Sequence, residues 1–410
     1  MDQITTAVKQ LYDTYPFPPD PLSNEPPPGY NWRWCWSVAY NFCTGQKPQR
    51  QDIRILDAGC GTGSSTEYLI QLNPEAAVMG IDLSEGAIAV AKERCQRSGI
   101  STVGTPVPEF KRLSVYDVNQ LDGEFDFINC VGMLHHLPDP IKGLQSLAAK
   151  LAPGGLIHIF VYAELGRWEI RLMQQAIALL QGEGKIDYQQ GVKIGRQLFA
   201  NLPKDNRLVK YEATRWAMEN QRDECFADMY VHPQEIDYNI KTLFELIDAS
   251  GLEFIGFSNP DYWMPERLLG QSTELMQQFK TLNERDTPNG TLRERYRLIE
   301  LLDPEISHYE FFLAKPPLPS INWSDDQALN AAIPEISPCL NGWPSQTLFD
   351  YNYQLASLSE AEYEFMKACD TADAQQTPQK TVKQILAEVQ FDLEGVRSLH
   401  TRQFILLTPG

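Results

Sequence analysis

The central part of the chain alternates between short apolar runs and longer stretches in which apolar residues recur every three or four positions. The short runs predict β-strands at 53–57, 77–82, 110–115, 125–131 and 156–162. The amphipathic stretches predict helices at 64–72, 86–98 and 141–151, the first with a capping box of Ser64 and Glu67. Strands that alternate with helices form a parallel sheet with helices on both faces. We therefore expect an α/β domain here.

The region that follows is mostly helical but contains two further strand patterns. These lie at 253–257 and 309–314, and the second ends at a proline-rich boundary, Pro316-Pro-Leu-Pro. We expect the two strands to pair as an antiparallel edge of the same sheet. Helical insertions would then occupy 163–250 and 262–302, and the α/β domain would span residues 51–316.

Residues 320–410 predict a separate C-terminal module. Its pattern indicates helices at 359–369, 381–389 and 393–400, followed by a terminal strand at 403–407. Three short helices and a strand suggest a small winged-helix-like module.

The first 50 residues form an arm rich in proline and aromatic residues. Prolines in the segments 16–21 and 26–28 exclude a continuous helix, so we expect extended or turned backbone. A solvated linker would not carry so many aromatic side chains, because these side chains favour burial. We expect the arm to pack against the body of the protein, in the manner of a lid.

The overall charge narrows the classes of partner. The 410 residues include 35 basic and 54 acidic ones, for a formal net charge of −19. A protein that binds nucleic acid normally carries a basic surface, and an anionic membrane also attracts basic segments. We expect neither nucleic acid nor membrane as a partner.

The cysteines and the N-terminus indicate the compartment. Eight cysteines are scattered without a Cys-x-x-Cys pair, which favours reduced thiols over disulfides or a zinc site. The start Met1-Asp-Gln-Ile lacks the pattern of a signal peptide, and no apolar run reaches membrane-spanning length. We expect a cytoplasmic protein without a metal.

A glycine-rich loop after the first predicted strand carries the clearest chemistry. It reads Asp57-x-Gly-x-Gly-x-Gly63, and a helix follows it. Glycines let the backbone turn and approach a ligand closely, and the helix N-terminus presents free amide groups. Asp82 lies nineteen residues beyond Gly63, at the end of the second strand, where an acid can accept both hydroxyls of a ribose. A dinucleotide fingerprint would require glycine at Ser64.

This loop resembles the first motif of the class I S-adenosylmethionine (SAM)-dependent methyltransferases, whose sheet is Rossmann-like. The resemblance continues through Gly80-Ile-Asp-Leu-Ser, Tyr116-Asp-Val, the segment 126–139 and Leu151-Ala-Pro-Gly-Gly, so it covers about residues 51–162. It implies a methyltransferase with SAM as its cofactor, bound by Asp57, Gly59, Cys60, Gly61, Gly63, Asp82, Leu83, Asp117, Val118 and Cys130.

The resemblance also implies individual roles for these residues. The glycine loop would line the methionine end, Asp82 would bind the ribose diol, and Leu83 would lie against the adenine. Asp117 would accept from the adenine amino group, although an acid there can equally cap a turn. Asp57 has an alternative role too, as a brace for the loop.

Several segments are candidates for the site of the methyl acceptor. In the arm, Tyr12, Tyr15, Trp32 and Arg33 would close over the cofactor and contact its carboxylate, unless the arm is purely structural. His135 and His136 follow the fourth strand, where such a pair can also simply pack the loop. Glu164, just past the fifth strand, is a further candidate.

The polar segment 220–233 supplies the catalytic candidates Asp228, Tyr230 and His232. Histidine is a workable base near neutrality, so these side chains would position or deprotonate an acceptor. The alternative is a capped loop before a helix that begins at Pro233.

Three functions remain open from the sequence. The whole chain resembles cyanobacterial methyltransferases, among them the phycobiliprotein β-subunit asparagine methyltransferases, which implies a protein substrate. A second possibility is a methyltransferase of small metabolites. A third is a non-catalytic binding protein with a SAM fold, which the intact glycine loop disfavours.

Overall fold

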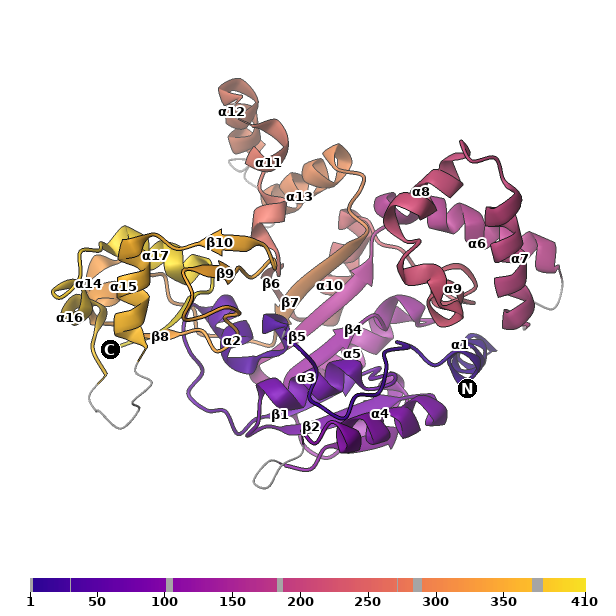
Figure 1. The fold of residues 1–410 in the computed structure, drawn as a ribbon, viewed down its shortest axis with the longest axis horizontal. Helices are drawn as coiled ribbons and strands as arrows, with labels where there is room; N and C mark the ends of the chain where they lie inside the picture. Colours follow the sequence, from indigo (N-terminus) through magenta and orange to yellow (C-terminus); the bar gives the residue numbers. More distant parts are fainter. Residues whose placement is uncertain are drawn as a thin grey trace.

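The computed structural model describes residues 3–29, 31–100, 106–182, 187–270, 272–282, 290–370 and 379–410. Its centre is a seven-stranded sheet with the order β3-β2-β1-β4-β5-β7-β6 (Figure 1). The strands are β1 Arg54–Ala58, β2 Ala77–Asp82, β3 Glu109–Arg112, β4 Phe125–Val131, β5 Leu151–Tyr162, β6 Glu253–Phe257 and β7 His308–Ala314. β1 to β5 are parallel, whereas β7 runs antiparallel to β5 and to β6. The predicted Rossmann-like fold is confirmed, and its last two strands form an antiparallel edge.

Helices cover the sheet on both faces because its central strands are apolar on both sides. One face packs against α2 Trp36–Thr44, α3 Ser64–Leu72 and α4 Glu85–Arg97. The other packs against α5 Pro140–Lys150, α10 Ile240–Ser250 and α13 Gly290–Leu302. In β1, for example, Ile55 points to the first helix layer and Leu56 to the second, and both are fully buried.

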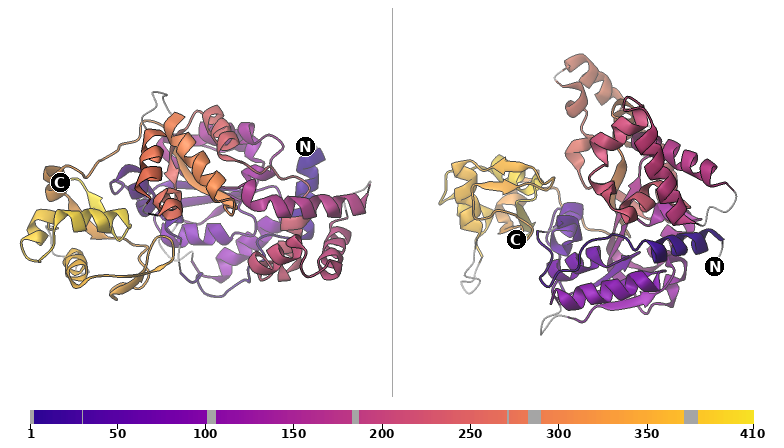
Figure 2. Two further views of the ribbon diagram at one scale, coloured as in Figure 1. Left: turned by 90° about the horizontal axis from the view of Figure 1, so that it is seen from above. Right: turned by 45° about the vertical axis from the view of Figure 1, so that its right-hand side comes forward.

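The arm differs from the expectation at both of its ends. It contains α1 Gln3–Thr14, the 3₁₀ helix η1 Trp32–Trp34 and α2. The prolines do exclude helix between residues 16 and 29, but the stretches on either side of them lack proline and are helical. Helix α1 lies beside α4 and carries the N-terminus to the side of the sheet where the parallel strands end (Figures 1 and 2).

The segment 220–233 also differs from the expectation. It is not a capped loop, since it forms the end of η5 Glu219–Gln221 and helix α9 Asp223–Tyr230. The next helix, α10, begins at Ile240 instead of Pro233, capped by Asn239. The helix over 64–72 forms as predicted but without its capping box: its N-cap is Gly63, and no side chain caps it.

Two groups of helices interrupt the second half of the sheet. Between β5 and β6 lie η4 Leu165–Arg167, α6 Trp168–Gln181, α7 Tyr188–Asn201 and α8 Arg207–Arg215, followed by η5, α9 and α10. Between β6 and β7 lie η6 Pro260–Trp263, α11 Glu266–Leu269, α12 Thr273–Leu282 and α13; residues 283–289 of the expected second insertion lie outside the described residues. Helices α6 to α9 enclose their own apolar cluster, which includes Leu11 of α1.

The described residues between 320 and 410 enclose another apolar core, and we propose that this core marks the C-terminal module. It contains α15 Glu360–Cys369, α16 Val382–Leu386, α17 Leu393–Thr401 and the last strand, β11 Ile405–Thr408. The described residues also include elements that the sequence did not predict: α14 Asp326–Ala331, β8 Ile333–Ile336, β9 Thr347–Phe349 and β10 Leu355–Ser357. β11 pairs with β8, and β9 pairs with β10 in a hairpin that precedes the three helices.

The module is joined to the α/β domain mainly through α2 and the residues after it. Ile321 N–H donates to the Thr44 carbonyl, and Lys47 N–H donates to the Leu407 carbonyl. His400 Nε2 lies 3.0 Å from Asn41 Oδ1, and burial lowers the pKa of His400 to about 4. None of the helices in the described residues is long and apolar enough to cross a membrane.

The buried His400 predicts an acid-sensitive module. Its folded pKa of about 4 lies below the ordinary value of 6.5, so the unfolded chain binds the proton more readily. The contribution of His400 to the free energy of unfolding is therefore fully present above its ordinary pKa. This contribution decreases as the pH falls toward the pKa that His400 has in the folded protein. In urea unfolding at about pH 7.5 and about pH 5, His400→Gln should lower the midpoint at the higher pH and reduce the loss on acidification. An equal acid-induced loss in both proteins would contradict this role.

Candidate active site

A cavity of about 1050 Å³ lies beyond the carboxyl ends of the parallel strands. Its floor consists of the loops that follow β1, β2 and β4, and the arm covers one side of it. Helix α9, Trp216 and residues 218–222 also line it, and they meet the arm through Tyr12 and Pro19. In open α/β sheets this edge is where ligands bind.

The glycine loop after β1 forms the floor of the cavity. Gly59, Gly61 and Gly63 have φ angles of +80°, +51° and +85°, which favour glycine over other residues. A Cβ on Gly59 would lie 2.7 Å from the Met133 side chain, and one on Gly61 would overlap the Phe17 carbonyl oxygen. The glycines therefore serve both the turn and the close approach of the segments that cover it.

Asp57 lies beneath this loop and outside the cavity. Its carboxylate accepts hydrogen bonds from the Ser65 and Thr66 hydroxyls at 2.7 and 2.6 Å and from Asn129 Nδ2 at 2.8 Å. The Asp57 side chain is buried, and burial raises the pKa of its carboxyl group. The three hydrogen bonds oppose this shift, because they stabilise the charged form. The geometry matches a brace for the loop and the start of α3.

Asp82 stands at the end of β2 with its carboxylate on the cavity wall. Oδ2 accepts the Gly61 N–H at 3.0 Å and Oδ1 accepts the Ser84 N–H at 2.8 Å. Burial raises its pKa, while these backbone donors oppose the shift. The carboxylate is thus held in place with oxygen lone pairs still available to a ligand.

The structure brings five of the ten expected cofactor residues to the cavity: Gly59, Cys60, Gly61, Asp82 and Leu83. The other five are Asp57, Gly63, Asp117, Val118 and Cys130, which do not line it. Asp117 is exposed on the 3₁₀ helix η2 Val115–Gln120, and its neighbour Tyr116 lines the cavity instead. Val118 and Cys130 are core residues, and Val131, the last residue of β4, lines the cavity.

The arm lies directly on the glycine loop. The Phe17 carbonyl accepts from Thr62 N–H at 3.2 Å, and the Pro18 carbonyl accepts from the Thr62 hydroxyl at 2.6 Å. Arg94 of α4 donates to the Asp20 carbonyl at 2.8 Å and to the Thr62 carbonyl at 3.0 Å. Residues 17–20 consequently form part of the cavity wall.

Of the four arm residues expected over the cofactor, Tyr12 lines the cavity and the other three do not. Trp32 packs in the core and Arg33 forms a buried ion pair with Glu310 at 2.8 Å, so neither lines the cavity. Trp34 lines it instead, and Tyr15 does not. Tyr12 does line it, and its hydroxyl donates to Asp228 Oδ1 at 2.8 Å.

A buried polar row crosses the sheet from the loop to the arm. Asn129 Oδ1 lies 3.0 Å from His158 Nδ1, and His158 Nε2 lies 3.1 Å from Glu310 Oε1. Arg33 and His158 hold the pKa of Glu310 at about 2, despite its burial. Because Asn129 also binds Asp57, this row connects the brace of the loop to Arg33.

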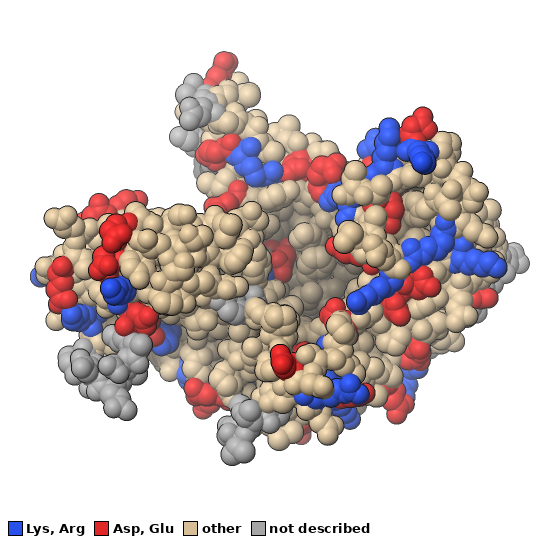
Figure 3. All heavy atoms as spheres, in the orientation of Figure 1, with Lys and Arg blue, Asp and Glu red and all other residues tan. Residues whose placement is uncertain are grey.

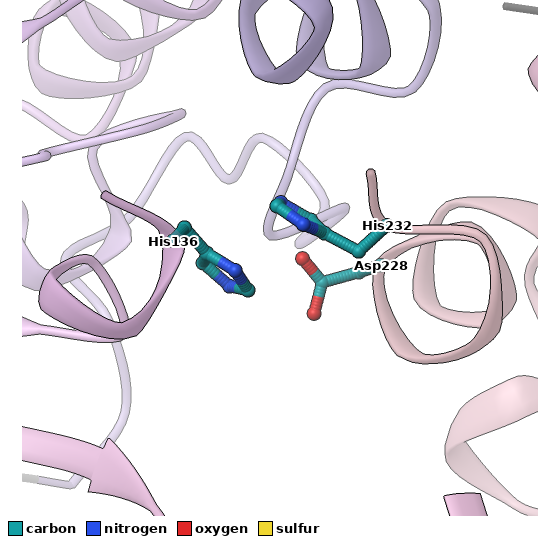
Figure 4. A group of neighbouring side chains, drawn as sticks. All are labelled: His136, Asp228 and His232. Carbon is teal, nitrogen blue, oxygen red and sulfur yellow. The ribbon is translucent and has the colours of Figure 1, made fainter. Parts of the chain in front are cut away.

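Two histidines and an aspartate face one another on the acceptor side. His136 comes from η3 Leu134–His136 after β4, whereas Asp228 and His232 come from α9 and its end (Figure 4). The two imidazole rings stack with centroids 3.7 Å apart. His136 and Asp228 line the cavity, whereas His232 lies behind them. Burial raises the pKa of Asp228 and lowers that of His232 well below its ordinary value.

The remaining acceptor-side candidates point away from the cavity. Tyr230 donates its hydroxyl to Glu212, and Glu164 accepts from Asn239 at 2.7 Å, so both are engaged elsewhere. His135 is fully buried without a partner for either ring nitrogen, and burial lowers its pKa well below the ordinary value.

The His136, Asp228 and His232 group is compact enough to suggest a metal site. One ligand atom from each residue lies within 4.8 Å of the others. However, the Gln234 N–H donates to His232 Nδ1 at 3.1 Å, so the neutral ring carries its proton on Nε2. In this conformation His232 has no lone pair left for a metal, and two ligands alone do not make a site.

Sequence reasoning did not single out Arg167 or residues 216–219, which precede the candidate segment 220–233. Arg167 is 2% exposed, lies 3.4 Å above the Tyr162 ring and pairs with Glu235 at 3.1 Å, while part of it still lines the cavity. A single arginine at the start of a helix belongs to no local sequence pattern that would indicate a binding site. In the rim, Met218 is 82% exposed, which is an unusual position for a large apolar side chain.

The residues of the cavity floor fit the expected nucleoside cofactor. Gly59 and Gly61 have no side chains that would keep a ligand away from the loop backbone. The carboxylate of Asp82 is held beside the loop by the Gly61 N–H. Leu83 and Tyr116 add apolar surface next to that carboxylate. These are the features that a nucleoside with a ribose diol requires, so the fold and the cavity define a nucleoside-binding α/β enzyme.

Comparisons with known proteins identify the family. A model described as "Methyltransferase domain" matches residues 55–155. An uncharacterised protein of Synechococcus sp. (strain ATCC 27144 / PCC 6301 / SAUG 1402/1) is 57% identical over 100% of this chain and 94% of its own length. Phycocyanin operon protein W of Pseudanabaena tenuis, also uncharacterised, is 74% identical over 23% of this chain and 89% of its own. The solved structure of PKMT2 from Rickettsia typhi in complex with AdoHcy shares the fold, with a TM-score of 0.60. The match covers 93% of this chain and 77% of the PKMT2 chain at 15% sequence identity.

The chain belongs to the class I SAM-dependent methyltransferases. Its cofactor is SAM, whose sulfonium carries an electrophilic methyl group. The protein's own contribution is to hold an acceptor atom in line with that methyl group and to exclude water from it.

Gly61→Ala should weaken binding of the product S-adenosylhomocysteine by about 10-fold or more, since left-handed backbone and the Phe17 carbonyl both oppose a Cβ. Isothermal titration calorimetry measures this. Gly86→Ala in α4 is the matched control, because its Cβ would meet only Ser84 Oγ at 3.7 Å and its affinity should be unchanged. Equal affinity in the two variants would contradict the close approach of the arm.

Asp82→Asn tests the carboxylate on the cavity wall. An amide turns one of the two oxygens into an NH₂ group, which would face the N–H of either Gly61 or Ser84. The loss of a charged acceptor costs about 1.5–3 kcal/mol, so affinity for S-adenosylhomocysteine should fall about 10- to 100-fold. The same titration measures it, with circular dichroism to show that the variant is folded. Asp117→Asn should have no comparable effect if its exposed position persists when the cofactor binds.

Proposed function

We propose that this methyltransferase modifies a protein side chain, and specifically an asparagine of a phycobiliprotein β subunit. The observation that carries the proposal is the hollowed surface (Figure 3) beside the helical insertion, whose helix α9 lines the cavity. The face in Figure 3 is deeply hollowed between the C-terminal module and the helical insertion. A wide hollow of this kind suits a folded partner better than it suits a metabolite, which binds in an enclosed pocket.

Exposed apolar side chains at the cavity rim and on the β9–β10 hairpin support a protein partner. Met218 at the cavity rim is 82% exposed, and Leu355 on the β9–β10 hairpin is 71% exposed. Phe349 and Tyr353 of the same hairpin are 40% and 46% exposed. Aromatic residues and methionine are enriched where proteins bind proteins.

The relatives support the choice of phycobiliprotein. The chain is 57% identical to a cyanobacterial protein along its whole length, and 94 residues of it are 74% identical to a protein named for the phycocyanin operon. A phycobiliprotein substrate also implies that the enzyme works in the cytoplasm, and the net charge of −19 disfavours nucleic acid as an alternative polymer.

A small-molecule methyltransferase is the second candidate, on one specific observation. The cavity of about 1050 Å³ is at the upper end of the range for small-ligand sites, so it has room for the cofactor and a compact metabolite together. A non-catalytic binder is the least favoured, because the glycine loop and Asp82 retain the geometry that the cofactor requires.

Labelled SAM distinguishes the candidates. The purified protein is incubated with methyl-labelled SAM and cyanobacterial lysate, before and after removal of small molecules, and separately with purified phycocyanin. We expect label in one protein band that survives the removal and in the phycocyanin β subunit, at an asparagine located by peptide mass spectrometry. The Asp82→Asn variant is the control and should reduce the label.

Two outcomes would count against the proposal. Label confined to the small-molecule fraction would favour a metabolite as acceptor. Label in another protein band, with none in phycocyanin, would retain the protein acceptor but exclude the phycobiliprotein.

A further inference from the structure

The backbone of Gln234 contacts both imidazoles of the acceptor-side group. Its carbonyl oxygen lies 2.9 Å from His136 Nδ1, and its N–H lies 3.1 Å from His232 Nδ1. One residue thus presents an acceptor to one ring and a donor to the other. Because a neutral imidazole has one N–H and one lone pair, each contact fixes which nitrogen holds the proton.

The two rings are fixed in opposite tautomers. A carbonyl oxygen only accepts, so His136 carries a proton on Nδ1, and in the neutral ring the lone pair is then on Nε2. A backbone N–H only donates, so the lone pair of His232 is on Nδ1 and its proton is on Nε2. His232 Nε2 is buried without a hydrogen-bond partner, which leaves this N–H group available as a donor.

We propose that His136, and not His232, is the general base of this enzyme, and that its acceptor gives up a proton on methylation. The proposal rests on methyl transfer as the function and narrows the acceptor to an N–H, O–H or S–H group. His136 lines the cavity, whereas His232 does not line it, stacks on the His136 ring and has an unpartnered Nε2. Gln234 acts as a positioning residue through its backbone.

The proton and electron pairs balance in a single displacement. The acceptor atom forms the new bond to the methyl carbon with its own electron pair, and sulfur keeps the pair of the broken S–C bond. The proton of the acceptor moves to His136 Nε2, and the resulting imidazolium releases it to solvent after the product leaves. The positive charge that disappears from sulfur is thereby matched by the one that appears on His136.

Several titratable groups surround His136. Asp228 faces it from α9 and is held by the Tyr12 hydroxyl at 2.8 Å. The other titratable groups around it are His135 on its own segment, Tyr12 on α1, Tyr162 on β5, His232 after α9 and Arg167 on η4. Arg167 is balanced by Glu235 and Asp237, which leaves Asp228 as the carboxylate nearest the ring.

Nuclear magnetic resonance of the imidazole nitrogens tests the tautomers without an acceptor. The full chain has six histidines, so ¹⁵N-histidine labelling gives few signals, and His136→Gln and His232→Gln assign them. We expect His136 with a protonated Nδ1 and an unprotonated Nε2, and His232 with the reverse, in the free protein and with S-adenosylhomocysteine bound. A protonated Nε2 on neutral His136 would overturn the proposal. Should a Gln variant fail to fold, the Asn variant replaces it.

The pH dependence of methyl transfer to phycocyanin tests the base itself. His136→Gln should lower kcat about 100-fold or more and abolish the decline in rate at acid pH, with the KM for SAM within about 2-fold. His232→Gln, the matched control, should retain that decline. If His232→Gln abolished the decline and His136→Gln retained it, the base would be His232. If a chelator removed the activity and a divalent metal restored it, a metal site at these residues would be favoured instead. Absence of transfer to any acceptor would count against the proposed function and leave the resonance result to decide the tautomers.

Discussion

The seating of the arm on the glycine loop is the contact on which the whole site depends. The Phe17 carbonyl occupies the space that a side chain on Gly61 would fill, and Thr62 binds both Phe17 and Pro18. The loop therefore has two surfaces with separate demands. One face must accommodate the cofactor, and another must accommodate the arm, which explains why a Cβ is excluded at Gly61. At Gly59 the Met133 side chain excludes a Cβ instead.

The two halves of the cavity differ in how they are built. The cofactor half comes from consecutive strand ends in one stretch of chain, so its geometry follows from the parallel sheet. The acceptor half combines Tyr12 of the arm, His136 after β4 and Asp228 of α9, and only tertiary packing brings these together. Such a division lets a common cofactor site serve different acceptors through changes in the inserted helices and the arm.

This division also explains what the sequence could predict. The strands, the glycine loop and Asp82 were predictable because their pattern is local and their spacing is set by one strand-helix-strand unit. Asp117 was expected at the adenine, yet it is exposed while Tyr116 lines the cavity, because the turn of a short 3₁₀ helix decides which neighbour points inward. Arg33 was expected at the cofactor but pairs with Glu310, a partner far away in sequence. The choice between His136 and His232 as the base depends on the contacts that the Gln234 backbone makes with the two rings. The spacing of residues in the sequence cannot predict these contacts.

The arm links the two halves of the cavity to each other. Phe17 rests on the glycine loop, and Tyr12, five residues earlier, holds the carboxylate of Asp228. Asp13 accepts from Ser84 Oγ at 2.7 Å, so the same helix also touches the segment that follows Asp82. Any movement of the arm that opens the cofactor loop must therefore break the hydrogen bond to Asp228 or bend the chain between Tyr12 and Phe17. The cofactor side of the cavity and the surroundings of His136 are thus joined through α1 and the residues that follow it.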